Sequence, residues 1–554
     1  MKYVIVFILF LTACKDNTNN TNQNDFADDK LVHIYEMQDR RDTRGLLPFL
    51  KAKKEKHRIA AALAFASIQD TLAIPYLNQM LQIDQDPMPR RAAAVALGQI
   101  RHPKALPILR SAFDGELQNS NRPYILEAIG KCGDSATIST FEKTEYQDSS
   151  LQVGWVYGVF RLGQKGFYSD ILLNRMMDLI RLTEHYDIKE ELAAHYLQRY
   201  YRKYPNADKS PIQNMIKTKN AHFVSDRLRL ILEENAFKEP EISDTEFFYE
   251  EAYFDDYEKA GLIRRHKQMT IQFEKYVAST IYNDTIASIV RTTAFEQLLA
   301  ILPKENRKWE YVLDGLKSTD MALQSLAALE IQKGIKDEEN WKILDPKHPK
   351  EFLDQLVLIK KELRLPQQAE TYIDVCNAIE KLGGSKFDGY QPKFNHPIEW
   401  DFVKTIPHNQ QVIIKTNKGD ITLQLFVNDA PGTVSNFLKL VDSGFYDNRS
   451  FHRVVPQFVV QGGCPRGDGW GSLDWTQRSE FSNYQKYSTG TVGIASAGKD
   501  TEGVQFFITH CPTPHLDGRY TIFARVTEGM NIVEKMKVGD RIISIKRFMT
   551  ILDY

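Results

Sequence analysis

The chain has 554 residues, more than one hydrophobic core normally serves, so two or more domains are expected. Its 71 basic and 72 acidic side chains leave a formal net charge of −1. This balance argues against a dedicated nucleic-acid-binding protein, which would carry a basic face, and an apolar content of 42% argues against gross disorder.

The first residues have the pattern of a secretion signal. One lysine precedes an apolar run at residues 3–11, which is too short to anchor stably across a bilayer. The run ends Leu-Thr-Ala-Cys, which resembles the lipobox of bacterial lipoproteins, where the cysteine is acylated and becomes the first mature residue. The resemblance implies a signal peptide at residues 1–13, a lipid on Cys14 and a place in the cell envelope, facing the periplasm or the exterior. An ordinary signal peptide that happens to precede a cysteine is the alternative.

Residues 14–30 are polar and low in complexity, so we expect a flexible tether. No later stretch is apolar and long enough to suggest a membrane span. Four further cysteines, Cys132, Cys376, Cys464 and Cys511, are too few for a disulfide scaffold and lack metal-ligand spacing. We expect free, mostly buried thiols and no metal, with pairing of Cys464 and Cys511 as the alternative.

A repeat with an offset of 32 residues follows the tether. Residues 58–77, RIAAALAFASIQDTLAIPYL, align without a gap with residues 90–109, RRAAAVALGQIRHPKALPIL, and a third copy begins at residue 122. Each copy pairs an Ala-rich helix with a second apolar helix, and such a pair buries its apolar face by stacking on its neighbours. Equivalent positions hold Arg58, Arg90 and Arg122, then Ala66, Gly98 and Gly130.

The pattern resembles HEAT-type repeats and predicts an all-α solenoid over residues 31–382, with a surface for clients or a protein partner. Beyond about residue 165 the repeat blurs while helical periodicity persists. An irregular helical domain with three true repeats is the alternative. The stretch 243–261, SDTEFFYEEAYFDDYEKAG, is interpreted as a helix with an acidic solvated face, or else as a docking surface.

Glycines, prolines and scattered aromatic residues mark a linker at residues 383–408. From residue 409 the apolar period changes to 2, and Asn417-Lys418-Gly419-Asp420 signals a hairpin. A helix with Thr433 as N-cap follows, then strand patterns at FHRVVPQFVVQ, TVGIASA, QFFIT and YTIFARV, the short helix MNIVEKM and the strand RIISIKRF. Many strands with few helices predict a closed antiparallel barrel.

These segments also identify a family. FHRVVPQFVVQGG, GIASAGKDTEGVQFFIT, HLDGRYTIFARVTEGMNIVEKM and APGTVSNFLKLV stand in the order and spacing of cyclophilins, over residues 409–554. The resemblance implies an eight-stranded antiparallel barrel with two helices and peptidyl-prolyl cis-trans isomerase activity on proline-containing proteins or peptides, without a cofactor.

An unpaired buried charge is costly, so an arginine inside an apolar strand pattern indicates a functional role rather than a packing role. In the resemblance, Arg453 occupies the position of the catalytic arginine of the family. Rotation about an X–Pro bond needs a donor that stabilises the twisted amide, and arginine is a permanently charged fork of donors. The resemblance implies that Gln461 orients Arg453 and that Phe458 belongs to the catalytic set. It further implies substrate-binding positions at His452, Val459, Ala495, Ser496, Ala497, Gln505, Phe507, His515, Leu516 and Tyr520.

Within that set, Phe458, Val459, Phe507 and Leu516 match the proline pocket, and the segment 495–497 matches the strip that pairs with substrate main chain. His452 is expected to be a structural neighbour rather than a general base. Three positions depart from the family. His515 replaces the tryptophan of cyclosporin-sensitive members, which puts tight cyclosporin binding in doubt, Tyr520 replaces a frequent histidine, and Ser496 replaces a frequent asparagine.

The favoured hypothesis is therefore a membrane-tethered isomerase that assists exported proteins through slow prolyl steps, with the repeats recruiting clients. The alternative is a tethered scaffold whose barrel only binds proline-containing segments.

The lipid anchor is directly testable. Replacing Cys14 by alanine removes the acylation site, so the protein is expected to leave the membrane fraction of cells that express it. Recovery of Cys14→Ala wholly in the membrane fraction would count against lipidation.

Overall fold

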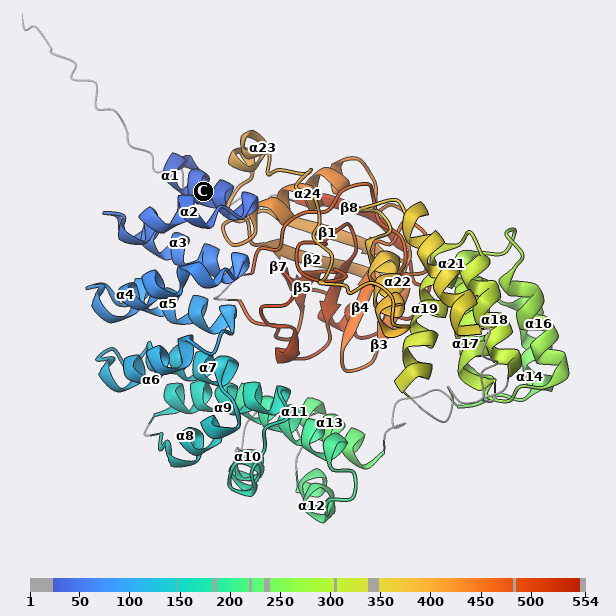
Figure 1. Ribbon diagram of the computed structural model, residues 1–554, viewed down its shortest axis with the longest axis horizontal. Coiled ribbons are helices and arrows are strands. Elements are labelled where there is room, and N and C mark those ends of the chain that lie inside the picture. The colour runs from blue at the N-terminus through green and yellow to red at the C-terminus, as the bar shows by residue number, and fades with distance from the viewer. Residues whose placement is uncertain are drawn as a thin grey trace, which may run out of the picture.

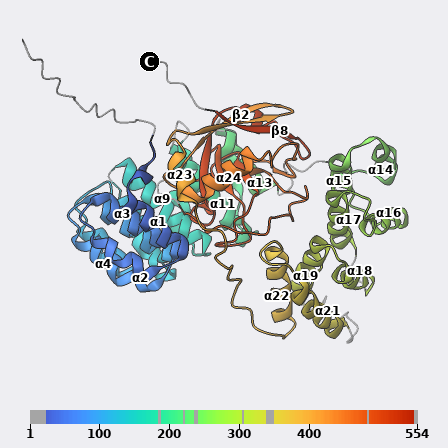
Figure 2. The ribbon, with the colours of Figure 1, turned by 90° about the horizontal axis from the view of Figure 1, so that it is seen from above.

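The computed structural model describes residues 23–146, 148–182, 187–218, 222–233, 240–302, 306–336, 348–481 and 485–548. A helical region precedes an eight-stranded antiparallel barrel, which confirms the predicted fold class (Figure 1). The helices form two arms, and the barrel lies between them (Figure 2). Within the described ranges, no helix is both long and apolar enough to cross a bilayer. The predicted signal peptide, Cys14 and residues 14–22 of the tether lie outside the described residues.

The N-terminal arm consists of helices stacked in chain order, with α3 against α5, α5 against α7, α7 against α9, α9 against α11 and α11 against α13. Its buried apolar side chains are continuous with those of the barrel. The helices are α1 (Asp29–Arg40), α2 (Thr43–Leu46), α3 (Glu55–Ile68), α4 (Ile74–Ile83), α5 (Pro87–Ile100), α6 (Ala105–Gly115), α7 (Arg122–Cys132), α8 (Ile138–Lys143), α9 (Ser149–Gln164), α10 (Asp170–Leu182), α11 (Ile188–Lys203), α12 (Ser210–Thr218) and α13 (His222–Leu232).

The repeated arginines have repeated partners. Arg58 donates to Asp84 at 2.7 Å and to the Ala52 carbonyl at 3.0 Å, which ties the start of α3 to the loop before α5. Arg90, 32 positions later, donates to Glu116 at 3.0 Å and to the Asp84 carbonyl at 2.8 Å. Each arginine thus joins its own helix to the loop that leads into the next repeat.

Small residues set the spacing of the stacked helices. A Cβ added at Gly98 of α5 would lie 2.7 Å from the Cβ of Ala128 in α7, and one at Gly130 would collide with the backbone of Gly158 in α9. Because a side chain at either glycine would force the helices apart, the small residues in the repeat pattern follow from close helix packing.

The C-terminal arm has a separate apolar core. Helices α15, α17, α19 and α22 stack in order. Among the described residues, the buried apolar side chains of the region predicted as one solenoid thus fall into two clusters, one in each arm. The helices are α14 (Asp244–Glu250), α15 (Asp256–Arg265), α16 (Ile271–Ile281), α17 (Ser288–Ile301), α18 (Asn306–Lys317), α19 (Met321–Lys336), α21 (His348–Glu362) and α22 (Ala369–Lys381).

The acidic, aromatic stretch 243–261 forms α14, a short 3-10 helix and α15 rather than one helix. Phe247 is buried against Phe273, whereas Tyr249 and Tyr253 are 73% and 78% exposed. The stretch therefore has an aromatic core face and an exposed aromatic face.

The linker forms a strap between the arms and the barrel. The His396 ring stacks on Trp475 of the barrel at 4.1 Å, and α23 (Trp400–Thr405) follows. Phe26 packs against Trp400, and Asn24 donates to the Val403 carbonyl at 2.7 Å. Residues 24–30, which we expected in the flexible tether, are instead folded, because this strap offers them apolar and polar partners.

The barrel has the strand order β3-β4-β6-β5-β7-β2-β1-β8 with all neighbours antiparallel, and a bridge between Ser450 and Arg541 brings its two edges together. The predicted hairpin is confirmed, with Asn417 and Lys418 between the paired residues Thr416 and Gly419. The strands are β1 (Gln411–Thr416), β2 (Gly419–Leu425), β3 (Arg453–Val455), β4 (Val459–Gly462), β5 (Thr491–Ile494), β6 (Phe506–Thr509), β7 (Ile522–Glu528) and β8 (Ile542–Phe548).

Two local predictions were wrong. The run 451–463 is not one buried strand but the tight hairpin β3–β4, which turns at Gln457 with φ of 57°. Helix α24 (Pro431–Asp442) begins before Thr433, and its first amides Gly432 and Thr433 donate to the buried carboxylate of Glu480 at 2.9 and 2.8 Å. A distant side chain therefore caps this helix in place of a local one. The second short helix of the barrel is α25 (Met530–Val533).

A buried arginine joins the N-terminal arm to the barrel. Arg161 of α9 donates to Glu127 of α7 at 2.8 Å, to Asp517 of the barrel at 2.9 Å and to the Pro514 carbonyl at 2.6 Å. Burial opposes ionisation of Glu127, but the charges of Lys131, Lys486 and Arg161 outweigh it and hold the pKa of Glu127 well below its usual value. The interface is therefore an ionised network shielded from water.

Removing this arginine should destabilise the protein strongly. Arg161→Met leaves the Glu127 and Asp517 carboxylates buried with less compensation, so the free energy of unfolding, measured by urea denaturation, is expected to fall by about 3 kcal/mol. The matched control is Arg181→Met, which breaks the exposed Arg181–Asp178 pair of 3.2 Å. That change should stay within about 0.5 kcal/mol, and an equal loss in both variants would contradict the role of burial.

Candidate active site

The hairpin β3–β4 places the predicted catalytic residues together. Arg453 and Gln461 face each other in the strand register, and the Arg453 Nη1 donates to the Gln461 Oε1 at 3.4 Å. The guanidinium carbon of Arg453 lies 5.6 Å from the centre of the Phe458 ring at the end of the turn. Arg453 is exposed to solvent, so its free donors are accessible. Neighbouring protein lowers the pKa of Arg453 by desolvation, with Tyr520 opposing the shift, and the arginine stays charged at neutral pH.

An apolar cluster lies beside this arginine. It has a buried base and a half-buried border, so its apolar surface is partly open. Of the four residues predicted for the proline pocket, Val459, Phe507 and Leu516 lie in the base and Phe458 lies on the border, together with the predicted substrate-binding residues Ala495 and Tyr520. The base consists of Val459, Tyr487, Phe507, Leu516 and Ile522, and the border consists of Phe426, Phe458, Ala495 and Tyr520.

Three members of this cluster were missed by sequence reasoning. Tyr487 comes from a loop without a motif, and its ring stacks on Phe507 at 5.6 Å. Ile522 stands in a predicted strand two positions after Tyr520, so the alternation of that strand could have indicated it. Phe426 directly follows β2, and nothing in its local sequence distinguishes it from other core residues.

The polar residues form a chain behind the arginine. Gln461 Nε2 donates to Gln505 Oε1 at 3.0 Å. Gln505 Nε2 in turn donates to the carbonyls of Gly469 and Gly471 at 2.7 and 2.9 Å. These carbonyls belong to residues 463–472, which we call the glycine-rich loop. Gln505, a predicted substrate-binding residue, thus lies beside Gln461, and its side chain is already hydrogen-bonded.

The segment 495–497 borders the cluster through Ala495, whose amide donates to the Gln505 carbonyl at 2.8 Å. Ala495, Ser496 and Ala497 are all half-buried. The Ser496 hydroxyl has no hydrogen-bond partner among the described residues. Small side chains here leave the main chain approachable.

The two histidines of the site are neutral. His452 is buried, and desolvation together with the charge of Arg453 lowers its pKa to about 4. His515 stacks on Phe458 at 5.4 Å, and desolvation plus the charges of Arg199 and Arg227 lowers its pKa to about 3. Neither histidine is protonated near pH 7.

The N-terminal arm packs behind His515. The His195 ring of α11 lies 5.8 Å from the His515 ring and contacts the Pro512 carbonyl through Nε2 at 3.0 Å. Arg227 of α13 reaches the Cys511 thiol at 3.3 Å. A compact imidazole at position 515 therefore lies where a repeat helix packs closely. Cys511, like Cys132, Cys376 and Cys464, is buried and free.

Known protein families match the barrel and the N-terminal repeats separately. The family profile "Cyclophilin type peptidyl-prolyl cis-trans isomerase/CLD" matches residues 411–550, and "HEAT repeats" matches residues 43–129. A peptidyl-prolyl cis-trans isomerase of Synechococcus elongatus is 49% identical over 138 residues, which cover 24% of this chain and 94% of that protein. The chain belongs to the cyclophilin-type isomerases.

Peptidyl-prolyl cis-trans isomerase B of Bacillus subtilis is likewise 49% identical over 121 residues, covering 22% of this chain and 85% of that protein. A Cryptosporidium parvum cyclophilin-type isomerase, solved in the presence of the dipeptide Ala-Pro, is 34% identical with a TM-score of 0.25, over 26% of this chain and all of that one. The predicted enzyme class and the HEAT-like repeats are thus confirmed.

No group of three or more His, Cys, Asp or Glu side chains arranged to hold a metal ion occurs in the described part of the chain.

The site predicts a flat pH profile. Because the pKa values of His452 and His515 are lowered to about 4 and about 3, both rings gain a charge only under acid conditions. The kcat/KM for isomerisation of a proline-containing peptide is therefore expected to stay constant from about pH 5.5 to 8. A transition centred near pH 6.5 that disappears in His452→Gln or His515→Gln would contradict this assignment.

Proposed function

We propose that Arg453 is the electrostatic catalyst of this cyclophilin-type isomerase. The observation that carries the proposal is its placement: an exposed, charged guanidinium that is bonded to Gln461 and adjoins an apolar cluster with a half-buried border. Rotation of an X–Pro bond makes and breaks no covalent bond, so neither a nucleophile nor a metal is required. The catalyst must favour the twisted amide over the planar one, against a barrier of about 18–20 kcal/mol.

The geometry gives each neighbour a role in this proposal. Phe507, Leu516 and the border residue Phe458 would hold the proline ring by apolar contact. Arg453 would then donate toward the prolyl nitrogen, whose lone pair returns as amide resonance is lost, in a site where apolar walls reduce solvent screening. Gln461 restricts the orientation of Arg453. The main chain of 495–497 would pair with the residues flanking the proline.

In the cell, we place this activity on exported proteins. The proposal rests on the lipobox-like ending at Cys14, which implies an envelope protein held at a membrane by its lipid. Uncatalysed prolyl steps take tens of seconds, so an isomerase outside the cytoplasm would speed folding of its clients. The HEAT repeats are the part of the chain suited to bind a client or partner, because stacked repeats form extended surfaces.

The catalytic role predicts a specific loss in the full chain. Arg453→Ala is expected to lower kcat/KM on a proline-containing tetrapeptide about 100-fold, because one preorganised donor to the transition state is removed. The thermal melt should be unchanged because the side chain is exposed. The matched control is Arg525→Ala, an exposed arginine of β7, which should keep full activity. Unchanged turnover in Arg453→Ala would refute the mechanism, and a folded wild-type chain without turnover would favour a scaffold that only binds proline segments.

A further inference from the structure

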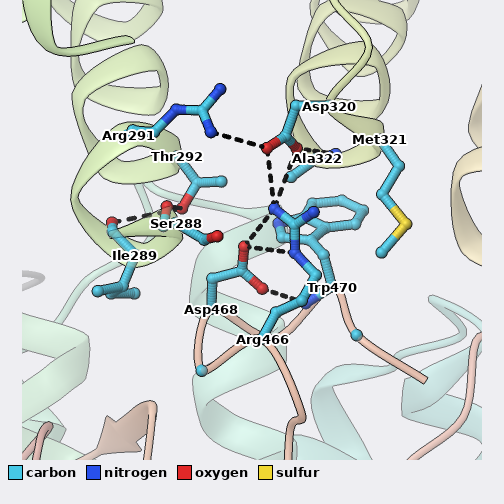
Figure 3. A network of polar contacts seen from close by, with 12 residues as sticks. Ser288, Ile289, Arg291, Thr292, Asp320, Met321, Ala322, Arg466, Asp468 and Trp470 are labelled. Carbon is cyan, nitrogen blue, oxygen red and sulfur yellow. Dashed lines mark hydrogen bonds and ion pairs between the residues drawn. The ribbon is translucent and has the colours of Figure 1, made fainter. Parts of the chain in front are cut away.

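The glycine-rich loop touches the repeat domain with one side and the active site with the other. It follows β4, and its Arg466 donates to both carboxylate oxygens of Asp320 at 3.0 Å. Asp320 precedes α19 in the C-terminal arm and accepts a hydrogen bond from the Ala322 amide at the start of that helix. Figure 3 shows Arg466 pointing from the barrel toward Asp320, with Arg291 of α17 on the other side of that carboxylate. Arg291 lies 3.6 Å from Asp320.

Two more contacts hold the same loop. The hydroxyl of Tyr257 in α15 donates to the Gly467 carbonyl at 3.0 Å. Gln367, before α22, donates to the Ser472 carbonyl at 3.3 Å. Three separate parts of the C-terminal arm therefore bind residues 466, 467 and 472, and the loop position depends on the arm.

The Arg466–Asp320 pair is well shielded. The side chain of Asp320 is 8% exposed and that of Arg466 is 25% exposed. The side chain of Asp468, the second partner of Arg466 at 2.8 Å, is fully buried. Burial alone would lower the pKa of Arg466, but hydrogen bonds and charges of Asp468 and Asp320 raise it above its usual value. An ion pair with this little water around it holds its geometry better than an exposed one.

Inside the loop, further bonds fix the carbonyls that face the active site. Asp468 accepts a hydrogen bond from the Trp470 amide at 3.0 Å. The Cys464 thiol accepts from the amides of Gly469 and Gly471, each at 3.3 Å. The carbonyls of these same glycines accept the two hydrogen bonds of Gln505. The residues that bind the arm and the acceptors that hold Gln505 therefore belong to one hydrogen-bonded loop.

We propose that Arg466 and Asp320 are positioning residues for the isomerase reaction, through which the C-terminal arm fixes the glycine-rich loop and thereby the Gln505–Gln461–Arg453 chain. The inference rests on the proposed catalytic role of Arg453. It makes the repeat domain part of the catalytic apparatus, beyond any role in binding clients. A barrel without the repeats would lack the Arg466–Asp320 ion pair, because Asp320 belongs to the repeats.

A double-mutant cycle in the full chain tests this inference. Arg466→Met and Asp320→Asn are each made in the wild-type and in the Arg453→Ala background, and kcat and KM are measured on one proline-containing tetrapeptide. In the wild-type background, each variant is expected to lower kcat about tenfold with little change in KM, because a misplaced catalytic group loses transition-state contact. In the Arg453→Ala background, neither should lower kcat further, because the group they position is gone.

The cycle separates positioning from general damage. A variant that only unfolds part of the molecules would lose the same factor in both backgrounds, and that result would overturn the proposal. Unchanged kcat in Arg466→Met and Asp320→Asn would overturn it as well. Full activity of the single variant Arg453→Ala would refute the proposed catalytic role of Arg453. That result is distinct from a failure of the positioning role, which only the Arg466 and Asp320 variants test.

Matched controls complete the test. Arg547→Met removes an arginine that pairs with Asp442 on the barrel, between β8 and α24, and it should leave kcat unchanged. Arg466→Lys keeps the charge but loses the fork that reaches Asp320 and Asp468 together, so its kcat should lie between those of wild type and Arg466→Met. A kcat for Arg466→Lys below that of Arg466→Met would contradict the ion-pair role.

Discussion

The barrel is joined to the repeats by a buried arginine, Arg161, which donates hydrogen bonds to two groups of the barrel. Arg161 joins the N-terminal arm to the segment that carries His515 and Leu516, through Asp517 and the Pro514 carbonyl. A buried guanidinium needs several acceptors in fixed positions, and Glu127 with these two barrel groups supplies them. The position of one wall of the active site is therefore coupled to the packing of α7 against α9.

The two arms contact different segments that border the candidate active site. The N-terminal arm packs behind the 511–517 segment through His195 and Arg227. The C-terminal arm holds the glycine-rich loop through Tyr257 and Asp320. An isomerase that works by electrostatic preorganisation gains from such support, because its donor must already be oriented when the amide twists. Both arms of the helical region therefore contact segments that border the candidate active site.

Sequence reasoning succeeded where a property is local or recurs. The 32-residue offset revealed the stacked helices, since Arg58 and Arg90 make equivalent contacts in successive repeats. It failed where a residue distant in the sequence determines the local structure. Thr433 looked like an N-cap, but the buried Glu480 carboxylate caps α24 from across the barrel. The 451–463 run looked like one strand, but the chain turns at Gln457 so that Arg453 can face Gln461.

The sequence by itself determined the fold class and the isomerase family, because periodicity and motif spacing are local properties of the chain, and it predicted part of the group of residues around Arg453. Only the tertiary structure decided that the helices form two arms, that residues 24–30 are folded, and that Arg466 meets Asp320 across 146 positions. The physical reason is that an ion pair or a shared core depends on which surfaces come together. No local pattern specifies the partner of a side chain that is hundreds of residues away, such as Arg161 and Asp517.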